Sequence, residues 1–189
     1  MTGVARTGRG ITTMNDNAPT PQQLRELVDA REIHGLMCHY FDHVDRLDPF
    51  RAAEIFTDDA EGDFMTGKIY VGPRKIARAL GRILLQYRHT SHHITNHRAV
   101  IDGDRASALT YIYAFHRMAG SDDTWHLWAR HVDELVRTKD GWRVKKRVLS
   151  ALDSVPEWDK IRREWYYGHP GRRTHDEMAA QLRATDEAK

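Results

Sequence analysis

The histidine-rich stretch 91–96 (SHHITN) contains the side chains of this sequence best suited to proton transfer. It continues through Val100 and Ile101 to the turn sequence Asp102-Gly103-Asp104, and this pattern predicts a β-strand that ends in a tight turn. A histidine on the inner face of a sheet needs a hydrogen-bond partner, because an unpaired buried polar group costs free energy. Neutral imidazole is also a useful base near neutral pH. We therefore expect His92 to point into a cavity, with its partner on the first helix.

Tyr40 and Asp45 are the polar side chains of the first predicted helix that could meet His92. Five residues of an α-helix turn through about 140°, so the two side chains are expected to flank a cavity instead of stacking. Each has an ordinary interpretation when taken alone. A carboxylate at the edge of an apolar stripe is usually solvated, and a tyrosine within the stripe is usually part of the core.

The elements that must position these residues follow an α+β order. Thr20-Pro21 predicts the start of the first helix, and its apolar stripe is Leu24, Leu27, Val28, Ile33, Leu36, Met37, Tyr40, Phe41, Val44 and Leu47. A short helix over 50–56, a turn at 58–59, strands over 61–65 and 68–71, and a helix from 73 to Tyr87 come next. Four strands joined by short turns then predict an antiparallel meander over about 91–101, 105–119, 123–138 and 142–153.

The predicted strand over 105–119 has two different faces. The first face is small and ends in a histidine: Ala106, Ala108, Thr110, Ile112, Ala114 and His116. The second face is larger and mostly aromatic: Leu109, Tyr111, Tyr113 and Phe115. Small side chains on a concave face leave room for a ligand, but they also let a helix approach closely. The second face could pack against helices or another subunit, and the pattern leaves both choices open.

Taken in order, these features resemble the SnoaL-like branch of the NTF2-like superfamily over about residues 25–153. The features are Tyr40 and Asp45 on the helix, His92 and Asn96 on one strand, His116 at the end of the next, and the run 133–143. Within that superfamily the pattern is closest to scytalone dehydratase, bile-acid 7α-dehydratase and hexachlorocyclohexane dehydrochlorinase. The resemblance implies a cone-shaped α+β fold, with a curved antiparallel sheet wrapped over N-terminal helices and the site inside the cone.

The resemblance also implies roles for individual residues. Asp45 matches the carboxylate that orients the catalytic histidine, and His92 matches that histidine, which removes a proton from the substrate. Tyr40 matches a polar position of the dehydratases, and His116 resembles their second histidine; both could donate hydrogen bonds to an enolate or a leaving hydroxyl. Many relatives have Tyr where this chain has His131. Substrate contacts are expected from His131, Asn96, Trp128, Ile112 and Phe64.

We therefore predict a cofactor-independent lyase of the dehydratase type, acting on a small, mostly apolar cyclic hydroxy or carbonyl compound. The alternatives with the same residues are a polyketide-type cyclase and a ketosteroid-type isomerase. A further alternative is a non-catalytic ligand-binding or assembly subunit of the same fold, similar to the small subunit of ring-hydroxylating dioxygenases. A homotrimer or homodimer built through the sheet is expected.

Composition bears on location and partners. The chain has 189 residues with 29 Lys and Arg against 27 Asp and Glu, and this small excess does not predict nucleic-acid binding. No apolar run approaches the ~20 residues of a membrane helix, and no signal peptide is recognised. Cys38 is the only cysteine, which favours the cytoplasm. Residues 1–19 are expected to be disordered, 20–153 to form the domain, and 154–189 to form a helical extension.

Two other functions compete with the enzyme. His39 and His43 lie one helical turn apart, and His92, His93 and His97 are dense, so a zinc site is conceivable, but no HExxH motif or cysteine cluster supports a metal. The run 143–147 (RVKKR) is basic, but on a strand it spreads its charge over both faces. We interpret it as a solvated face near the sheet edge, with no nucleic-acid partner.

Overall fold

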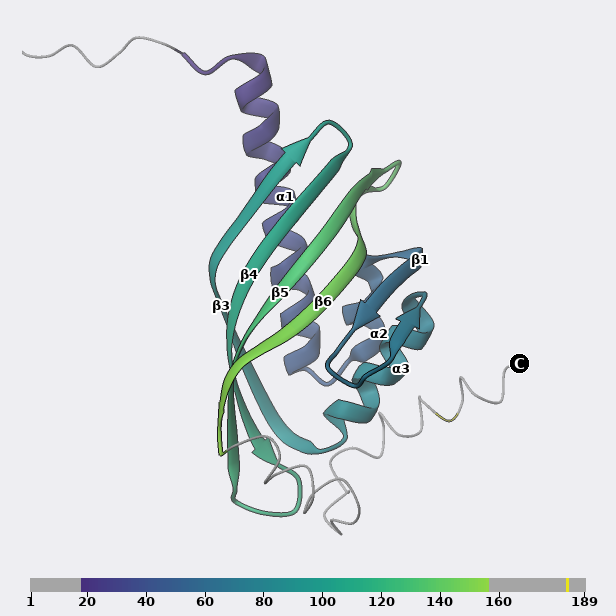
Figure 1. Cartoon of the computed structure of the whole chain (residues 1–189), viewed down its shortest axis with the longest axis vertical. Coiled ribbons are helices and arrows are strands. Elements are labelled where there is room, and N and C mark those ends of the chain that lie inside the picture. Colours follow the sequence, from purple (N-terminus) through teal and green to yellow (C-terminus); the bar gives the residue numbers. More distant parts are fainter. Residues whose placement is uncertain (1–17, 157–182, 184–189) are drawn as a thin grey trace, which may run out of the picture.

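The computed structural model describes residues 18–156 and 183. The helical elements are α1 (Pro21–Asp45), α2 (Pro49–Ala52), the 3₁₀ helix η1 (Ala53–Ile55) and α3 (Pro73–Leu84). The strands are β1 (Phe56–Asp63), β2 (Ile69–Val71), β3 (Tyr87–Asp102), β4 (Arg105–Met118), β5 (Thr124–Thr138) and β6 (Gly141–Val155). Figure 1 shows the four long strands beside α1, with the shorter elements at one end.

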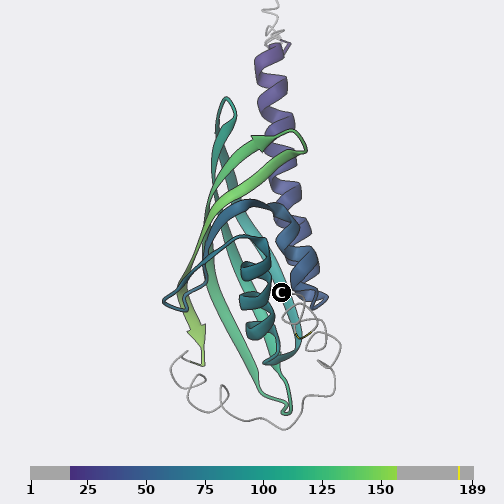
Figure 2. The same ribbon diagram turned by 90° about the vertical axis from the view of Figure 1, so that its right-hand side faces the viewer.

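The six strands form one curved sheet in the order β2-β1-β6-β5-β4-β3. The predicted meander is confirmed, because β3 to β6 pair antiparallel with their neighbours in sequence. The sheet as a whole is mixed, since β1 pairs parallel with β6 and antiparallel with β2. In Figure 2 the helices α1 and α3 lie on the same side of this curved sheet. The architecture is therefore the predicted α+β fold, with a concave face that the helices cover.

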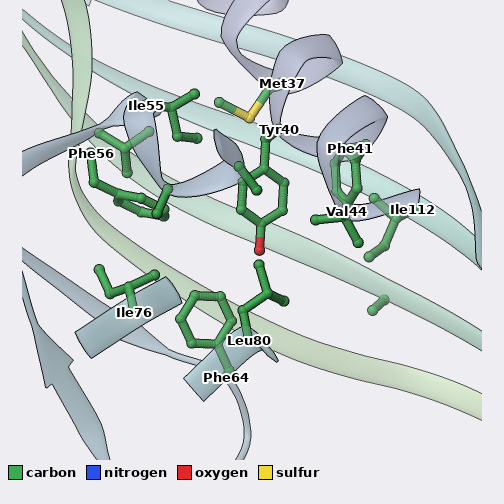
Figure 3. Packing of buried hydrophobic residues seen from close by; sticks show 14 of the residues in the cluster. Met37, Tyr40, Phe41, Val44, Ile55, Phe56, Phe64, Ile76, Leu80 and Ile112 are labelled. Carbon is green, nitrogen blue, oxygen red and sulfur yellow. The ribbon is translucent and has the colours of Figure 1, made fainter. Parts of the chain in front are cut away.

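Helix α1 begins at a capping box. The side chain of Thr20 accepts a hydrogen bond from the backbone N–H of Gln23, and the side chain of Gln23 accepts one from Thr20 in return. The buried face of α1 consists of Asp29, Ile33, Met37, Tyr40, Phe41 and Val44. Figure 3 shows several of these side chains packed against Phe56, Phe64, Ile76 and Leu80. This packing fixes the rotation of α1, and with it the direction in which Tyr40 points.

The first turns of α1 differ from the prediction. Leu24, Leu27 and Val28 were expected to continue the buried stripe, but all three are exposed. The reason is geometric, because the first part of α1 reaches the tips of the long strands (Figure 1), where an open hollow lies between Leu24 and Val28 of α1 and Ile101 of β3.

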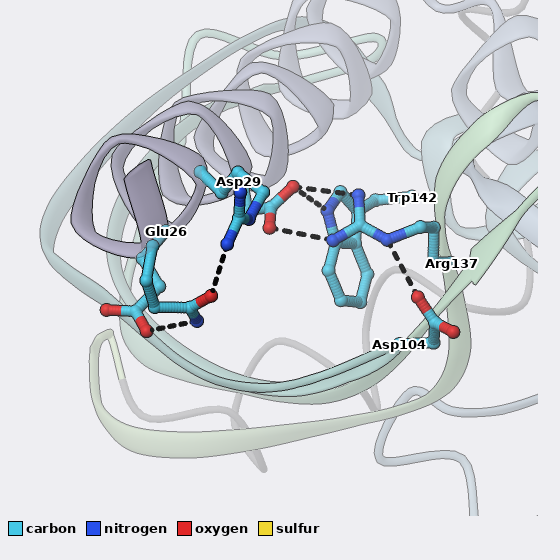
Figure 4. Close-up of polar contacts among 7 residues, drawn as sticks. Glu26, Asp29, Asp104, Arg137 and Trp142 are labelled. Carbon is cyan, nitrogen blue, oxygen red and sulfur yellow. Dashed lines mark hydrogen bonds and ion pairs between the residues drawn. The ribbon is translucent and has the colours of Figure 1, made fainter. Parts of the chain in front are cut away.

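A polar cluster at the far end from the cavity ties α1 to the sheet. Asp29 accepts two hydrogen bonds from the guanidinium of Arg137, at 2.8 and 2.7 Å, and a third from the indole N–H of Trp142 at 3.0 Å (Figure 4). Arg137 also donates to Asp104 at 3.0 Å, and its guanidinium lies 4.5 Å from the ring centre of Trp142. Hydrogen bonding to Arg137 holds the pKa of Asp29 below its usual value. The cluster fixes the tilt of α1 across the strands.

Several predicted boundaries need correction. Asp58 and Asp59 lie within β1 and not in a turn, and Tyr87 begins β3 instead of ending the preceding helix. Strand β6 extends to Val155, so residues 154 and 155 belong to the sheet and not to a C-terminal helix. Apart from residues 156 and 183, the rest of that predicted extension lies outside the described residues, and so do all but two residues of the predicted 1–19 segment. None of the described helices is long and apolar enough to span a membrane.

Candidate active site

Asp45 and His92 are in direct contact at the end of α1. The Nδ1 atom of His92 lies 2.6 Å from Oδ1 of Asp45, and the backbone N–H of His92 donates to Oδ2 of the same carboxylate at 2.9 Å. Because a carboxylate accepts hydrogen bonds, Nδ1 carries the proton and Nε2 of the neutral ring is left with a lone pair. The His92 side chain is only 9% exposed, so its ring is largely shielded from bulk water.

A third hydrogen bond completes the surroundings of Asp45. The hydroxyl of Thr90 donates to Oδ1 at 2.7 Å. Partial burial acts to raise the pKa of Asp45, but the hydrogen bonds from His92 and Thr90 together hold it below its usual value. The carboxylate therefore stays charged over the neutral pH range and keeps the His92 ring in one orientation and one tautomer.

His92 opens onto a cavity between α1, α3 and the concave face of the sheet. Its volume is about 170 Å³. The lining is mostly apolar and consists of Tyr40, Phe41, Val44, Phe64, Met65, Thr66, Leu80, Ile83, Leu84, Gln86, Tyr87, His92, Ile112, His116, Trp125, Leu127, His131 and Leu149. Figure 3 shows the hydroxyl of Tyr40 pointing away from α1 towards Leu80 and Phe64. Burial raises the pKa of Tyr40, so its hydroxyl keeps its proton and can donate a hydrogen bond.

Phe41 separates two of the cavity's histidines. Its ring stacks on His92 at 5.1 Å between centroids and on His131 at 5.3 Å, with interplanar angles of 25° and 18°. His131 is buried, and its Nδ1 atom has no hydrogen-bond partner among the described residues. Burial lowers the pKa of His131 far below its usual value, and the nearby positive charge of Arg147 lowers it further. His131 is therefore a neutral polar group in the cavity wall.

His116 is the third histidine of the cavity. Its Nδ1 atom lies 3.2 Å from the backbone carbonyl oxygen of Trp125, and its ring meets that of His92 edge to face at 5.4 Å. Burial, together with the charge His92 can carry, lowers the pKa of His116 to about 3, so the ring is neutral at ordinary pH. A carbonyl only accepts, so the one ring proton is on Nδ1. In this tautomer Nε2 of His116 accepts a hydrogen bond, whereas the role predicted from the sequence was that of a donor to the substrate.

A buried ion pair lies behind Tyr40. Arg147 and Asp133 are both fully buried, and the guanidinium donates to the two carboxylate oxygens at 2.7 and 2.8 Å. The guanidinium carbon also lies 4.3 Å from the ring centre of Tyr40. Burial acts to lower the pKa of Arg147, but Asp133 raises it above its usual value, so the guanidinium stays charged. The guanidinium packs against the face of the Tyr40 ring, and neither Arg147 nor Asp133 lines the cavity.

The sequence that forms this cavity is that of a known domain family. Residues 25–148 match the sequence profile of the SnoaL-like domain. The chain belongs to the SnoaL-like domain family, within the NTF2-like superfamily. This SnoaL-like chain is 31% identical over 129 residues to Rv2910c of Mycobacterium tuberculosis, an alignment that covers 65% of the chain and 85% of Rv2910c.

Solved structures give the same fold. A scytalone dehydratase-like protein of Novosphingobium aromaticivorans is 25% identical with a TM-score of 0.63, over 68% of the SnoaL-like chain and 87% of that protein. The dehydrochlorinase LinA-type3 of Novosphingobium barchaimii is 20% identical with a TM-score of 0.63, over 68% and 90% of the two chains. At that identity the dehydrochlorinase is evidence for the fold alone.

The structure brings most of the predicted site residues of this SnoaL-like domain together. Tyr40, His92, His116, His131, Ile112 and Phe64 line the cavity, and Asp45 holds His92. Asn96 and Trp128 do not reach it. Asn96 is exposed in a β-bulge with φ of 47°, and Trp128 is 40% exposed on the outer face of the sheet. Successive residues of a strand face opposite sides, so Trp128 points away from a cavity that Trp125 and Leu127 line.

Three contributors to the SnoaL-like site were missed from the sequence. Thr90 shares its strand face with His92, so the period of two was a usable signal for it. Phe41 was assigned only to the apolar stripe, with no indication that it separates two histidines. Arg147 was placed on a solvated basic face, and that interpretation is wrong because its side chain is fully buried.

Two further histidines, His39 and His43, lie on α1 outside the cavity. The rings of His39 and His43 contact each other at 4.5 Å between centroids, and Nε2 of His39 lies 3.2 Å from the carbonyl oxygen of Arg51. Within residues 18–156, no group of three or more His, Cys, Asp or Glu side chains is arranged to hold a metal ion.

Proposed function

We propose that this protein is a cofactor-independent lyase of the dehydratase type. Its substrate would be a small, mostly apolar cyclic compound with a hydroxyl or carbonyl group. The observation that carries the proposal is the 2.6 Å contact between His92 and Asp45, made where His92 lines an apolar cavity. A neutral histidine held in this way is suited to act as a general base. The likeness to a scytalone dehydratase-like protein supports the same class of reaction.

The proposed reaction is a proton abstraction followed by loss of water. Nε2 of His92 takes a proton from a carbon next to the substrate's carbonyl, and the C–H electron pair moves into an enolate. Asp45 stabilises the imidazolium that forms, and the Tyr40 hydroxyl donates to the enolate oxygen. The enolate then expels the hydroxyl on the adjacent carbon as a double bond forms. The imidazolium returns its proton to that oxygen, and water leaves.

The size of the cavity supports a ligand of one ring. An apolar cavity of roughly 150 Å³ is large enough for benzene, and the volume here is about 170 Å³. Polar lining groups such as Tyr40, Thr66 and Gln86 are few among apolar ones. A few polar groups in an apolar pocket orient a ligand, and the apolar remainder excludes water.

Product identification tests the proposal. Single-ring β-hydroxy ketones would be incubated with the wild-type protein and with His92→Ala, and the products identified by mass spectrometry and NMR. Loss of water that depends on His92 supports the dehydratase. A product of unchanged mass with a moved double bond, or a new ring, favours an isomerase or a cyclase using the same dyad. Binding without any reaction favours a ligand-binding subunit.

We further propose that the protein assembles through the outer face of its sheet. That face carries the exposed side chains of Trp128 and Val132 and the half-buried rings of Tyr111, Tyr113 and Phe115. Exposed apolar and aromatic side chains gathered on one face are typical of an interface, and a homodimer or homotrimer would cover them. The cytoplasm stays our expectation for its location, because Cys38 is an exposed free thiol.

A further inference from the structure

The main chain sets the hydrogen-bonding polarity of His116. Its Nδ1–H donates to the carbonyl oxygen of Trp125 at 3.2 Å, so Nε2 carries a lone pair and no proton. His116 lines the cavity, and among the described residues nothing is hydrogen-bonded to Nε2. The side of the ring left for a ligand can therefore only accept a hydrogen bond.

The ring of His116 is also held in place by its neighbours. Tyr87 lies 4.4 Å from it and Trp125 lies 4.6 Å from it, both measured between ring centroids. His116 is only 4% exposed, so a rotation about its side-chain bonds would require the surrounding aromatic rings to move. Such a rotation would also break the hydrogen bond to Trp125, leaving its carbonyl oxygen without that partner.

We propose that His116 is a specificity residue that accepts a hydrogen bond from a hydroxyl group of the ligand. The cavity would then select hydroxylated rings over rings with a methyl group in the same place. This inference deepens the proposed function and rests on it for the assumption that the cavity is the substrate site. It assigns the two oxygens of a hydroxy-carbonyl substrate to opposite partners: the hydroxyl donates to His116, and the carbonyl accepts from Tyr40.

The position of His92 supports this division. Its Nδ1–H is held by Asp45, so Nε2 of His92 is a second lone pair, on a ring that meets His116 edge to face at 5.4 Å. Two neighbouring acceptors repel a carbonyl oxygen placed between them and favour groups that offer protons. A substrate C–H group at His92 and a substrate hydroxyl at His116 offer a proton to both Nε2 atoms. A substrate oxygen that faces the apolar wall finds no hydrogen-bond donor there, and this costs binding free energy.

Binding of two probes of equal size tests the inference. Phenol has a hydroxyl where toluene has a methyl group, and the binding of either compound can be measured without turnover. Dissociation constants would be measured by NMR titration for the wild type, His116→Phe and the control His126→Phe. His126 belongs to the outer face of β5, where its Nδ1 lies 2.8 Å from the Tyr113 hydroxyl. We expect His116→Phe to weaken phenol about 3- to 12-fold relative to toluene, and His126→Phe to leave this ratio unchanged.

Undetectable phenol binding to the wild type, or an equal effect of His116→Phe on both probes, would overturn the inference. A second measurement uses the unmodified protein and so does not depend on a variant that folds. Long-range ¹H–¹⁵N spectra of protein labelled at histidine report which ring nitrogen carries the proton. We expect His116 to be protonated at Nδ1 alone from pH 5 to 8. A proton on Nε2 would overturn the inference, whereas failure of the proposed reaction would appear only as absent turnover.

Discussion

Asp45 holds His92 at two points, the ring and the backbone. One carboxylate oxygen lies 2.6 Å from Nδ1 of the ring, and the other accepts the backbone N–H of the same residue at 2.9 Å. The second bond ties the end of α1 to β3, so it fixes the position of the strand that carries His92 against the helix that carries Asp45. Orientation and tautomer of His92 are thus set by one side chain.

Replacing Asp45 tests that control directly. Asp45→Asn keeps the size of the side chain but removes its charge and one acceptor, so His92 is no longer held in the Nδ1–H form. We expect turnover to fall by roughly 10²- to 10⁴-fold with an unchanged circular-dichroism spectrum. Asp42→Asn is the matched control, because Asp42 is on the same helix and forms an ion pair at the surface with Arg46. Equal activity of the two variants would remove Asp45 from the mechanism.

The hydrogen bond from Thr90 to Asp45 is expected to contribute less to turnover than Asp45 itself. Thr90→Val keeps the branched shape and removes the 2.7 Å hydrogen bond to Asp45. Loss of one hydrogen bond to a carboxylate is worth about 1.5–3 kcal/mol, so we expect a loss of turnover of at most about 10²-fold, smaller than for Asp45→Asn. Steady-state kinetics of the two variants side by side would check the order. A larger loss for Thr90→Val than for Asp45→Asn would contradict it.

The buried histidines predict a pH dependence of stability. His116 has its pKa lowered to about 3 in the folded state, whereas an unfolded histidine titrates near its ordinary value of 6.5. Between these values the unfolded chain binds a proton that the folded protein does not, so this stabilisation is complete above pH 6.5 and is lost as pH falls. The slope is about 1.4 kcal/mol per pH unit for each such group.

Urea unfolding of the wild type and of His116→Phe from pH 7 to pH 4 would measure that slope. We expect the unfolding free energy of the variant to depend less steeply on pH, because unfolding takes up about one proton fewer. This holds whatever the stability of the variant at pH 7. His126→Phe, on the outer face, is the control for changing one histidine. Parallel pH curves for the wild type and His116→Phe would show that His116 is protonated in the folded protein.

The ion pair of Arg147 and Asp133 predicts a strong effect on folding. Arg147→Met leaves Asp133 as a buried charge without its partner and should cost about 3–5 kcal/mol of unfolding free energy. Adding Asp133→Leu removes the unpaired charge and should recover most of that loss. Lys146→Met, an exposed neighbour on β6, should change stability by less than about 0.5 kcal/mol. Chemical denaturation of the three variants would check these values.

A charged side chain on the outer face of the sheet should disrupt the proposed assembly. Trp128→Glu places a carboxylate in the apolar surface formed with Val132 and Tyr113, so the proposed homo-oligomer should dissociate to monomers. Light scattering coupled to size-exclusion chromatography would give the mass. Lys139→Glu, in the β5–β6 turn, is the control and should leave the mass unchanged. A wild-type protein that is itself monomeric would rule out this assembly.

Local patterns predicted the parts of the fold that follow an unbroken period. The spacing of apolar residues on α1 from Ile33 to Val44 predicted its buried face, and the resemblance to the SnoaL-like branch paired Asp45 with His92. Tyr40 and Asp45 were expected to flank a cavity, and Tyr40 does line it, but Asp45 is not among the lining residues and contacts His92 instead.

Two of the errors arise where the alternation of side chains along a strand is interrupted. Strict alternation from Trp142 and Val144 would bury position 146 and expose Arg147. A bulge on β6 inserts one residue between Val144 and Lys146, so Arg147 turns inward and faces Asp133. Asn96 marks a second bulge, on β3, where its left-handed backbone turns it away from the cavity. Neither bulge contains a Gly or Pro, so the local sequence does not indicate where the alternation is interrupted.

Hydrogen–deuterium exchange into bound carbon acids tests the central claim that His92 removes a proton from carbon. Single-ring hydroxy ketones would be incubated in D₂O with the wild type and with a folded His92→Ala variant, and analysed by mass spectrometry. This readout detects the abstraction whether dehydration, isomerisation or cyclisation follows it. We predict deuterium uptake or loss of water with the wild type and neither with the variant. Equal uptake with both proteins would contradict the role assigned to His92.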